Sequence, residues 1–159
     1  MDNTNHHNFL RQVTLFDGLT REELLGLDHL AEEVHYEKGA TVIEQGGKDR
    51  DVYLVVDGSA EVEIALQLDE QKSKHLATFH PGDFFGEVAL VDREPRSATV
   101  RAGDEGLTVL RIPYNKLETI MDRNHHIGYV VLKHISSALC ERIRATNVQV
   151  RDTFTWGRF

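Results

Sequence analysis

Short apolar segments separated by glycine turns fill the middle of the chain, and this pattern restricts the fold more than any other feature. Glycines at positions 39, 46 and 58 separate segments whose β-branched and aromatic content predicts strands. The alternation in Ala60-Glu61-Val62-Glu63-Ile64 is typical of a half-buried strand. The predicted strands lie at 40–44, 51–56, 59–66, 74–79, 97–102 and 106–112. Many short strands with glycine-rich turns favour an antiparallel β-roll of the jelly-roll or double-stranded β-helix type.

One polar stretch interrupts the strand pattern. Residues Asp69 to Lys74 are charged or polar throughout, without the alternation of the neighbouring segments. Because polar connections between strands usually run over the surface, this stretch is predicted to be a flexible hairpin loop.

Helical patterns flank the predicted roll on both sides. Thr20 and Glu23 have the spacing of a capping box, which marks the start of a helix. Apolar residues follow it at helical spacing, namely Leu24, Leu27, Ala31 and Val34. Further along, Pro113 begins a helix to about Asp122, and Asn124 caps a longer one. One stripe of the longer helix is apolar, with Ile127, Val130, Val131, Ile135, Ala138, Leu139, Ile143 and Val150.

The elements together predict a single domain, 1–159, of the α+β class and mainly β. Its expected parts are a helical segment 1–33, a β-roll 34–112, C-terminal helices 113–152 and a tail 153–159. The only cysteine, Cys140, lies among apolar residues of the predicted helix and is expected to be buried. With one cysteine, a polar N-terminus and no long apolar run, we expect a cytoplasmic protein without a membrane span.

Two opposite charges at a fixed spacing stand out within the predicted roll. Glu87 follows Gly86 directly, and Arg96 comes nine residues after Glu87. A guanidinium offers fork-shaped donors to a phosphate, and glycine lets the backbone approach a ligand closely. A carboxylate can accept a hydrogen bond from a sugar hydroxyl. The pair therefore indicates a compact ligand that carries both a phosphate and a hydroxyl, as a cyclic nucleotide does. An ordinary surface ion pair is the alternative reading of the same two residues.

The run Phe85-Gly86-Glu87-Val88-Ala89-Leu90, a five-residue spacer and then Arg96-Ser97-Ala98-Thr99-Val100 resembles the phosphate-binding cassette of cyclic-nucleotide-binding domains. Such domains occur in catabolite-activator-type regulators, in kinase regulatory subunits and in cyclic-nucleotide-gated channels. The resemblance implies a non-enzymatic sensor with its cassette at 84–99. Arg96 would neutralise the cyclic phosphate and Glu87 would hold the ribose 2′-hydroxyl. The ligand-binding residues it implies here are Phe85, Gly86, Glu87, Val88, Ala89, Arg96, Ser97 and Ala98.

The long C-terminal helix resembles the dimerisation helix of the catabolite-activator type, which implies contacts to the base. By this match Thr146 would contact the base, and Asn147 stands where a serine reaches across the dimer. Arg142 matches an arginine near the base, but a structural or exposed role is the expectation for it. Ser97 occurs in bacterial regulators that prefer cyclic AMP, so the resemblance implies cyclic AMP rather than cyclic GMP.

Mechanism and partners are expected to follow the same family. Ligand binding should move the helices after Pro113 against the roll, signalling within a homodimer through 125–150 or to an unknown effector protein. Only seven residues follow position 152, fewer than a helix-turn-helix needs, and the net charge is −8. We therefore expect no direct DNA binding.

Two other functions remain open from the sequence. A protein-interaction module could keep this fold while answering another ligand or none. A cupin-like metalloenzyme would need several ligands that converge inside the roll, but the nine histidines are scattered and no His-x-His pair lies on a predicted strand. No Ser/His/Asp set or second carboxylate accompanies Glu87. We expect no catalytic residues, metal or cofactor.

Overall fold

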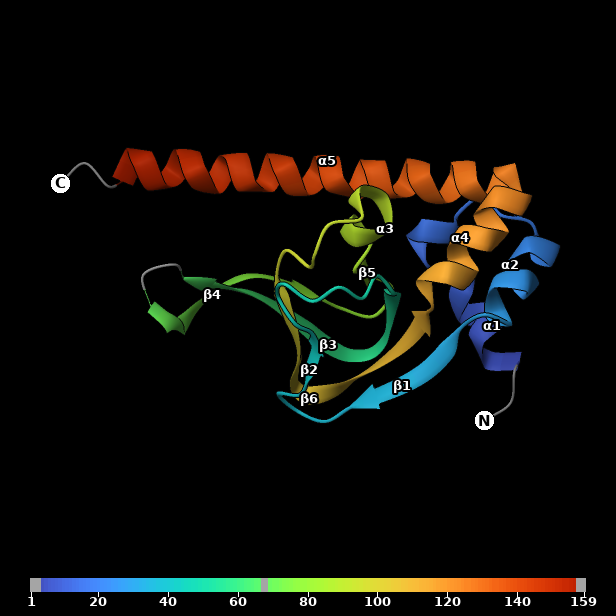
Figure 1. Cartoon of the computed structure of the whole chain (residues 1–159), viewed down its shortest axis with the longest axis horizontal. Coiled ribbons are helices and arrows are strands. Elements are labelled where there is room, and N and C mark those ends of the chain that lie inside the picture. Colours follow the sequence, from blue (N-terminus) through green and yellow to red (C-terminus); the bar gives the residue numbers. More distant parts are fainter. Residues whose placement is uncertain (1–3, 67–68, 157–159) are drawn as a thin grey trace.

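The computed structural model describes residues 4–66 and 69–156, and its centre is one antiparallel sheet rolled on itself (Figure 1). The strand order is β1-β6-β3-β4, with β2 paired to β6 and β5 paired to β3. The strands are β1 (Glu32–Tyr36), β2 (Thr41–Ile43), β3 (Val52–Leu66), β4 (Asp69–Phe79), β5 (Phe84–Phe85) and β6 (Thr99–Ile112). Helices precede β1 and follow β6 in the sequence, which confirms the predicted mainly-β roll with flanking helices.

Two long strands replace two pairs of predicted short ones. β3 runs through Gly58 and β6 runs through Gly106, with register shifts between Val55 and Asp57 and between Gly58 and Ala60. Gly58 has a φ of +78°, and a Cβ there would lie 2.2 Å from the carbonyl oxygen of Gly106. Glycine marks a bulge or a close backbone approach as well as a turn. The predicted breaks at 57–58 and 103–105 are therefore irregular or bent stretches within continuous strands.

The predicted flexible loop at Asp69–Lys74 is wrong, because these residues belong to β4. Leu66 pairs with Asp69 and Ile64 pairs with Lys74, so the hairpin extends beyond the body of the roll. Ser73 Oγ donates a hydrogen bond to Glu63 Oε2 at 2.8 Å. Backbone pairing and such polar cross-strand contacts allow a strand without an apolar face.

The N-terminal helices are α1 (Thr4–Leu10), the 3₁₀ turn η1 (Thr14–Phe16) and α2 (Arg21–Asp28). The capping box is confirmed: Glu23 N donates to Thr20 Oγ1 at 3.3 Å and Thr20 N donates to Glu23 Oε2 at 2.9 Å. The helix ends earlier than its apolar spacing predicted. Val34 lies in β1, where it pairs with Val109 of β6, so strand pairing overrides the local helical pattern.

The C-terminal helices are α4 (Tyr114–Arg123) and α5 (His125–Trp156). Asn124 caps α5 as predicted, since its Oδ1 accepts from the backbone N–H of His126 at 3.0 Å. The helix continues to Trp156, past the start of the predicted tail at 153, while 157–159 lie outside the described residues. No helix within 4–66 and 69–156 has both the length and the apolar character needed to cross a membrane.

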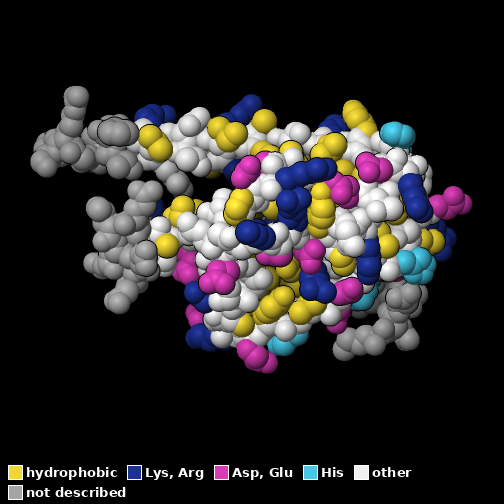
Figure 2. Space-filling view, in the orientation of Figure 1, with side chains coloured by type: hydrophobic (Ala, Val, Ile, Leu, Met, Phe, Trp, Pro, Cys, Tyr) yellow, Lys and Arg dark blue, Asp and Glu magenta, His cyan; other side chains and the backbone are white. Residues whose placement is uncertain are grey.

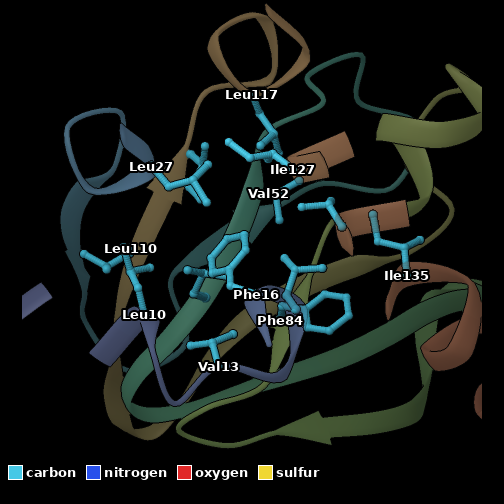
Figure 3. Packing of buried hydrophobic residues seen from close by; sticks show 14 of the residues in the cluster. Leu10, Val13, Phe16, Leu27, Val52, Phe84, Leu110, Leu117, Ile127 and Ile135 are labelled. Atoms are coloured by element: carbon cyan, nitrogen blue, oxygen red, sulfur yellow. The ribbon is translucent and has the colours of Figure 1, made fainter. Parts of the chain in front are cut away.

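Two apolar cores hold the domain together. One fills the space between the helices and the end of the roll, and includes Leu10, Phe16, Leu27, Leu117, Ile127 and Ile135 (Figure 3). The other lies inside the roll, around Tyr53, Val55, Val109 and Phe85. The two-residue strand β5 joins them, because Phe84 belongs to the first core and Phe85 to the second. Successive strand residues point to opposite faces, which places one short segment in both cores.

The apolar stripe of α5 divides into a covered part and an exposed part. Ile127, Val131 and Ile135 are buried in the core between the helices and the end of the roll, whereas Ile143 is 60% exposed and Val150 is 49% exposed. The C-terminal half of the helix projects past the body of the roll, above the β3–β4 hairpin (Figure 1). Cys140 is exposed rather than buried, because it lies on the outer side of this helix.

Candidate functional site

A cavity of about 660 Å³ opens between the roll, the β4 strand and α5. Nine of the ten sequence-predicted site residues line it: Phe85, Gly86, Glu87, Val88, Ala89, Arg96, Ser97, Ala98 and Thr146. Asn147 is exposed and does not line the cavity. Most of the remaining wall is apolar, with Ile43, Val62, Leu76, Val100, Leu139 and Val150.

The loop after β5 is built around Gly86. Its φ is +85°, and a Cβ there would lie 2.7 Å from the Asp51 carbonyl oxygen and 3.0 Å from Arg96 Nη1. Only glycine combines this backbone conformation with so close an approach. The chain then enters the short helix α3 (Val88–Asp92), whose first residues, Val88 and Ala89, line the same cavity. The first N–H groups of a helix have no intrahelical acceptors. The helix was not predicted from the sequence.

Arg96 is 5% exposed and is held by acceptors from three residues. Nη1 donates to the Gly86 carbonyl oxygen at 2.8 Å, and Nη2 donates to the Asp51 carbonyl oxygen at 2.8 Å. Asp49 Oδ1 accepts from Nη2 at 2.5 Å and from Nε at 3.2 Å. A guanidinium has five N–H donors, so these contacts leave one Nη1 hydrogen for a further acceptor. The cation is fixed in place before any anion arrives.

Glu87 is fully buried, which is unusual for a carboxylate. Arg142 Nη1 donates to Glu87 Oε1, and Arg142 Nη2 donates to the Phe84 carbonyl oxygen at 3.1 Å. Glu87 Oε2 is buried and has no hydrogen-bond partner within the part of the chain that the structure describes. Burial raises the pKa of Glu87, and the nearby Arg142 opposes that shift.

Arg142 is the main site residue that sequence reasoning underrated. Besides its ion pair, its guanidinium carbon lies 4.9 Å from the centroid of the Phe79 ring and 5.9 Å from that of Phe84. Its side chain is 36% exposed, because the cavity opens to solvent beside it. The signal in the sequence was its match to an arginine near the base, from which a structural or exposed role was expected. Arg142 also lies one helical turn from Thr146, whose Oγ1 donates to the Arg142 carbonyl oxygen at 2.9 Å.

The β4 strand supplies a wall of the cavity that the sequence did not reveal. Lys74, Leu76, Ala77 and Phe79 line it, opposite Ala145, Thr146 and Gln149 of α5. Phe79 stacks on Phe85 with ring centroids 5.8 Å apart, and Phe85 stacks on Tyr53 at 5.1 Å. Lys74 stood at the junction of the predicted loop 69–74 and the predicted strand 74–79, and nothing in the sequence pattern indicated that it faces a ligand site.

The described residues of the cavity do not form a cluster of metal ligands. Among the residues that the structure describes, no group of three or more His, Cys, Asp or Glu side chains could hold a metal ion. The cavity has instead one buried carboxylate, one buried guanidinium and an apolar wall.

Comparison with known proteins gives one family for this arrangement. Residues 33–124 match the family model of the cyclic nucleotide-binding domain. A cGMP-dependent protein kinase of Drosophila melanogaster, isozyme 2 forms cD5/T2, is 30% identical over 125 residues, which is 76% of this chain and 13% of the kinase. A cAMP-dependent protein kinase regulatory subunit of Blastocladiella emersonii is 35% identical over 126 residues, which is 73% of this chain and 30% of the subunit. The chain thus spans less than a third of either relative.

The fold is similar to solved structures as well. The catabolite activator protein of Thermus thermophilus superposes with a TM-score of 0.72 and 26% identity, over 87% of this chain and 62% of that one. The similarity extends beyond the roll into the flanking helices, because the shared part exceeds the residues that the family model matches.

Proposed function

The chain belongs to the cyclic nucleotide-binding domain family, as its cassette resemblance indicated, and we propose that it is a non-enzymatic sensor that binds a cyclic nucleotide in the cavity between the roll and α5. Its described part holds the sensor fold and not the catalytic domains of its kinase relatives. A cytoplasmic location, expected from the sequence, is part of this proposal.

The unpartnered oxygen of Glu87 is the observation that carries the proposal. A buried acceptor without a donor costs free energy, on the order of 1–3 kcal/mol, unless a ligand satisfies it. A ribose 2′-hydroxyl is a donor of the right kind for Glu87 Oε2. In the same cavity, the remaining Nη1 hydrogen of Arg96 and the first amides of α3 would bind the cyclic phosphate.

We favour cyclic AMP over cyclic GMP as the ligand. Thr146 lines the cavity from α5, and Ser97 lies on the cassette side. Thr146 Oγ1 donates its hydrogen to the Arg142 carbonyl and can still accept one from the amino group of an adenine. The two curated relatives point in different directions, since one is named for cyclic GMP and the other for cyclic AMP. Competition between the two nucleotides would decide, and a clear preference for cyclic GMP would contradict this assignment.

Signal output is proposed to run through the helices after Pro113. Leu90 of α3 is buried in the same core as Leu117 of α4 and Ile135 of α5, so a shift of the cassette would disturb helix packing. A ligand shifts such an equilibrium only by its differential affinity for the two arrangements. Amide hydrogen exchange should show greater protection at 84–99 and altered protection at 125–150 when cyclic AMP binds. Protection limited to the cassette would contradict this part of the proposal.

A second copy of the chain is the proposed partner for the outer face of α5. Tyr129, Leu132 and Ile143 are 65%, 44% and 60% exposed, and their helical spacing places them on one side of α5. Figure 2 shows hydrophobic side chains at the surface along this helix. Cys140 and Asn147 lie on the same side by helical spacing, so Asn147 would face the dimer rather than the cavity of its own chain. An effector protein would then read the position of the helices in the dimer.

One observation favours the alternative of an interaction module that has lost its nucleotide. Asp49 already neutralises Arg96, and Arg142 already neutralises Glu87, so the ligand-free cavity has internal partners for both charges. Because the pairs neutralise both charges without a ligand, a domain that no longer binds a nucleotide would retain them.

Titration calorimetry with cyclic AMP and cyclic GMP separates the two functions. Arg96→Ala and Glu87→Gln should each weaken binding at least about tenfold, since each removes a charge-assisted contact in a desolvated pocket. The 2′-deoxy analogue should bind the wild type more weakly, and this loss should shrink in Glu87→Gln. Unchanged affinity in either folded variant, or no binding of either nucleotide, would overturn the assignment.

A further inference from the structure

The loop before β3 touches both the anion-binding arginine and helix α4. Asp51 accepts a hydrogen bond from Arg96 Nη2 through its backbone carbonyl, at 2.8 Å. Its side-chain Oδ1 accepts from the backbone N–H of Tyr114 at 2.9 Å, and Tyr114 is the first residue of α4. One residue therefore contacts the proposed phosphate site with its main chain and a helix with its side chain.

The Asp51 carboxylate supplies a cap that the N-cap residue of α4 does not. Pro113 occupies the N-cap position and makes no side-chain cap hydrogen bond. The first N–H groups of a helix need outside acceptors, and a carboxylate is favoured there by the helix dipole. Asp51 provides that acceptor from 63 residues away in the sequence. Its carboxylate is 24% exposed, and its Oδ2 lies 3.9 Å from Arg111 Nε, so the cap is partly shielded from water.

Arg50, the residue before Asp51 in the same loop, makes a second connection between the cassette and α4. Arg50 Nη2 donates to the carbonyl oxygen of Arg93 at 3.2 Å, and the Arg50 guanidinium carbon lies 5.3 Å from the Tyr114 ring centroid. Arg93 ends α3 with a φ of +60° and donates from Nη2 to Glu118 of α4 at 2.8 Å. It is the one non-glycine residue with positive φ in the described part of the chain, and such conformations persist where the surroundings hold them.

We propose that Asp51 is a positioning residue that couples occupancy of the anion site at Arg96 to the position of helix α4. This inference rests on the proposed nucleotide binding. A phosphate that binds the remaining Nη1 hydrogen pulls on a guanidinium that also bonds to Asp49 and to the Asp51 carbonyl. A shift of Arg96 moves the peptide group of Asp51, and the carboxylate of the same residue carries that shift to the first turn of α4.

The contrast between Asp51→Ala and Asp51→Asn tests this coupling. The alanine variant retains the carbonyl for Arg96 and loses the cap, whereas asparagine retains an Oδ1 acceptor for Tyr114. Binding of cyclic AMP to Asp51→Ala should stay within about threefold of wild type, because the carbonyl contact persists. The ligand-induced change in amide exchange at 118–123 should disappear in Asp51→Ala and persist in Asp51→Asn. If the cap were purely structural, its loss in Asp51→Ala would raise amide exchange at Tyr114 in the free protein. The ligand-induced difference at 118–123 would then stay as in wild type.

The wild type decides the matter if Asp51→Ala does not fold. Binding of a cyclic nucleotide without any change in exchange at 114–123 would overturn the coupling and leave the proposed function intact. The same ligand-induced change in Asp51→Ala as in wild type would also overturn it. Absence of binding by both nucleotides would instead overturn the proposed function, and this inference with it.

Discussion

Arg142 of α5 donates a hydrogen bond to the fully buried carboxylate of Glu87, so the C-terminal helix and the cassette share one ion pair. The pair joins residues 55 positions apart in the chain. A ribose hydroxyl at Glu87 would add to this contact through Oε2 or compete with it at Oε1. In either case the ligand would act directly on the attachment of α5 to the cassette.

Removing the arginine of this pair should destabilise the protein in a pH-dependent manner. Arg142→Met keeps the apolar stem and leaves a buried carboxylate without a counter-charge, at a cost of about 1–3 kcal/mol for a pair that is partly open to solvent. Burial already raises the pKa of Glu87 above its ordinary value. The folded variant therefore retains the proton to higher pH than the unfolded chain, and its stability falls as pH rises through that pKa.

Urea denaturation at pH values between about 5 and 8 measures this effect. The matched control is Arg142→Met in a Glu87→Gln background, where no buried charge remains. There the loss should be smaller and should not vary with pH. Equal losses in both backgrounds would show that Arg142 acts through packing alone.

Adding a single methyl group at Gly86 should impair both folding and binding. Gly86 has a φ of +85°, and its Cβ would lie 2.7 Å from the Asp51 carbonyl oxygen. Gly39 has a φ of +73° with nothing within 4 Å of its Cβ, so Gly39→Ala is a control for backbone strain alone. Each substitution should cost about 1 kcal/mol or more. Only Gly86→Ala should also weaken nucleotide binding, by at least about tenfold, because it displaces Arg96. Equal affinities in the two variants would contradict this.

Acid should weaken the connection between α2 and the start of α5. Partial burial acts to raise the pKa of Glu23, but hydrogen bonds from Thr20, His126 and Asn124 outweigh it and lower the pKa from 4.5 to about 2. Since the folded-state pKa lies below the unfolded value, this stabilisation is fully present above 4.5 and is lost as pH falls toward 2. Glu23→Gln should cost on the order of 1 kcal/mol near neutral pH and less in acid. A constant difference across denaturation curves at these pH values would contradict the assignment.

The proposed dimer can be tested with the native cysteine as a reporter. Cys140 is exposed on the same side of α5 as Ile143. In a symmetric dimer through this face, mild oxidation should join two chains by a disulfide, whereas Ile143→Glu should prevent it and raise the dimer dissociation constant at least about tenfold. Leu25→Glu, at a residue 38% exposed on α2, is the matched control. Sedimentation of the wild type as a monomer at all concentrations would contradict the dimer.

The cassette was predictable because its chemistry lies within one short run of sequence. Gly86, Glu87 and Arg96 all line the cavity, as their spacing indicated. Their partners were not predictable, because Asp49 and Arg142 come from segments that only the tertiary fold brings to the cassette. A polar side chain in a loop or on a helix face gives no local sign of which distant group it will meet.

The predicted strand boundaries were wrong where the same residue type occurs in two different structures. Gly58 looked like a turn and is a close approach between paired strands, and the polar residues before Lys74 looked like a loop and form part of a hairpin. Val34 continued the helical spacing but pairs with Val109. In each case a non-local backbone pairing decided the structure. The sequence also offers Trp156, in the predicted tail, as an aromatic that would contact the base, and its side chain lies outside the described side chains.

The C-terminal half of α5, which extends over the cavity and the β3–β4 hairpin, gives the helix the geometry of a lever. At 1.5 Å per residue, the segment beyond Arg142 extends roughly 20 Å, so a tilt of about 10° at the cavity would displace its far end by roughly 4 Å. A tilt of α5 too small to change the shape of the roll would thus displace the far end of the helix enough for a bound protein to detect. For a given tilt, the displacement of the far end grows with the number of residues beyond the pivot near Arg142. Lengthening or shortening α5 by whole turns at that end would therefore change the displacement without altering the binding pocket.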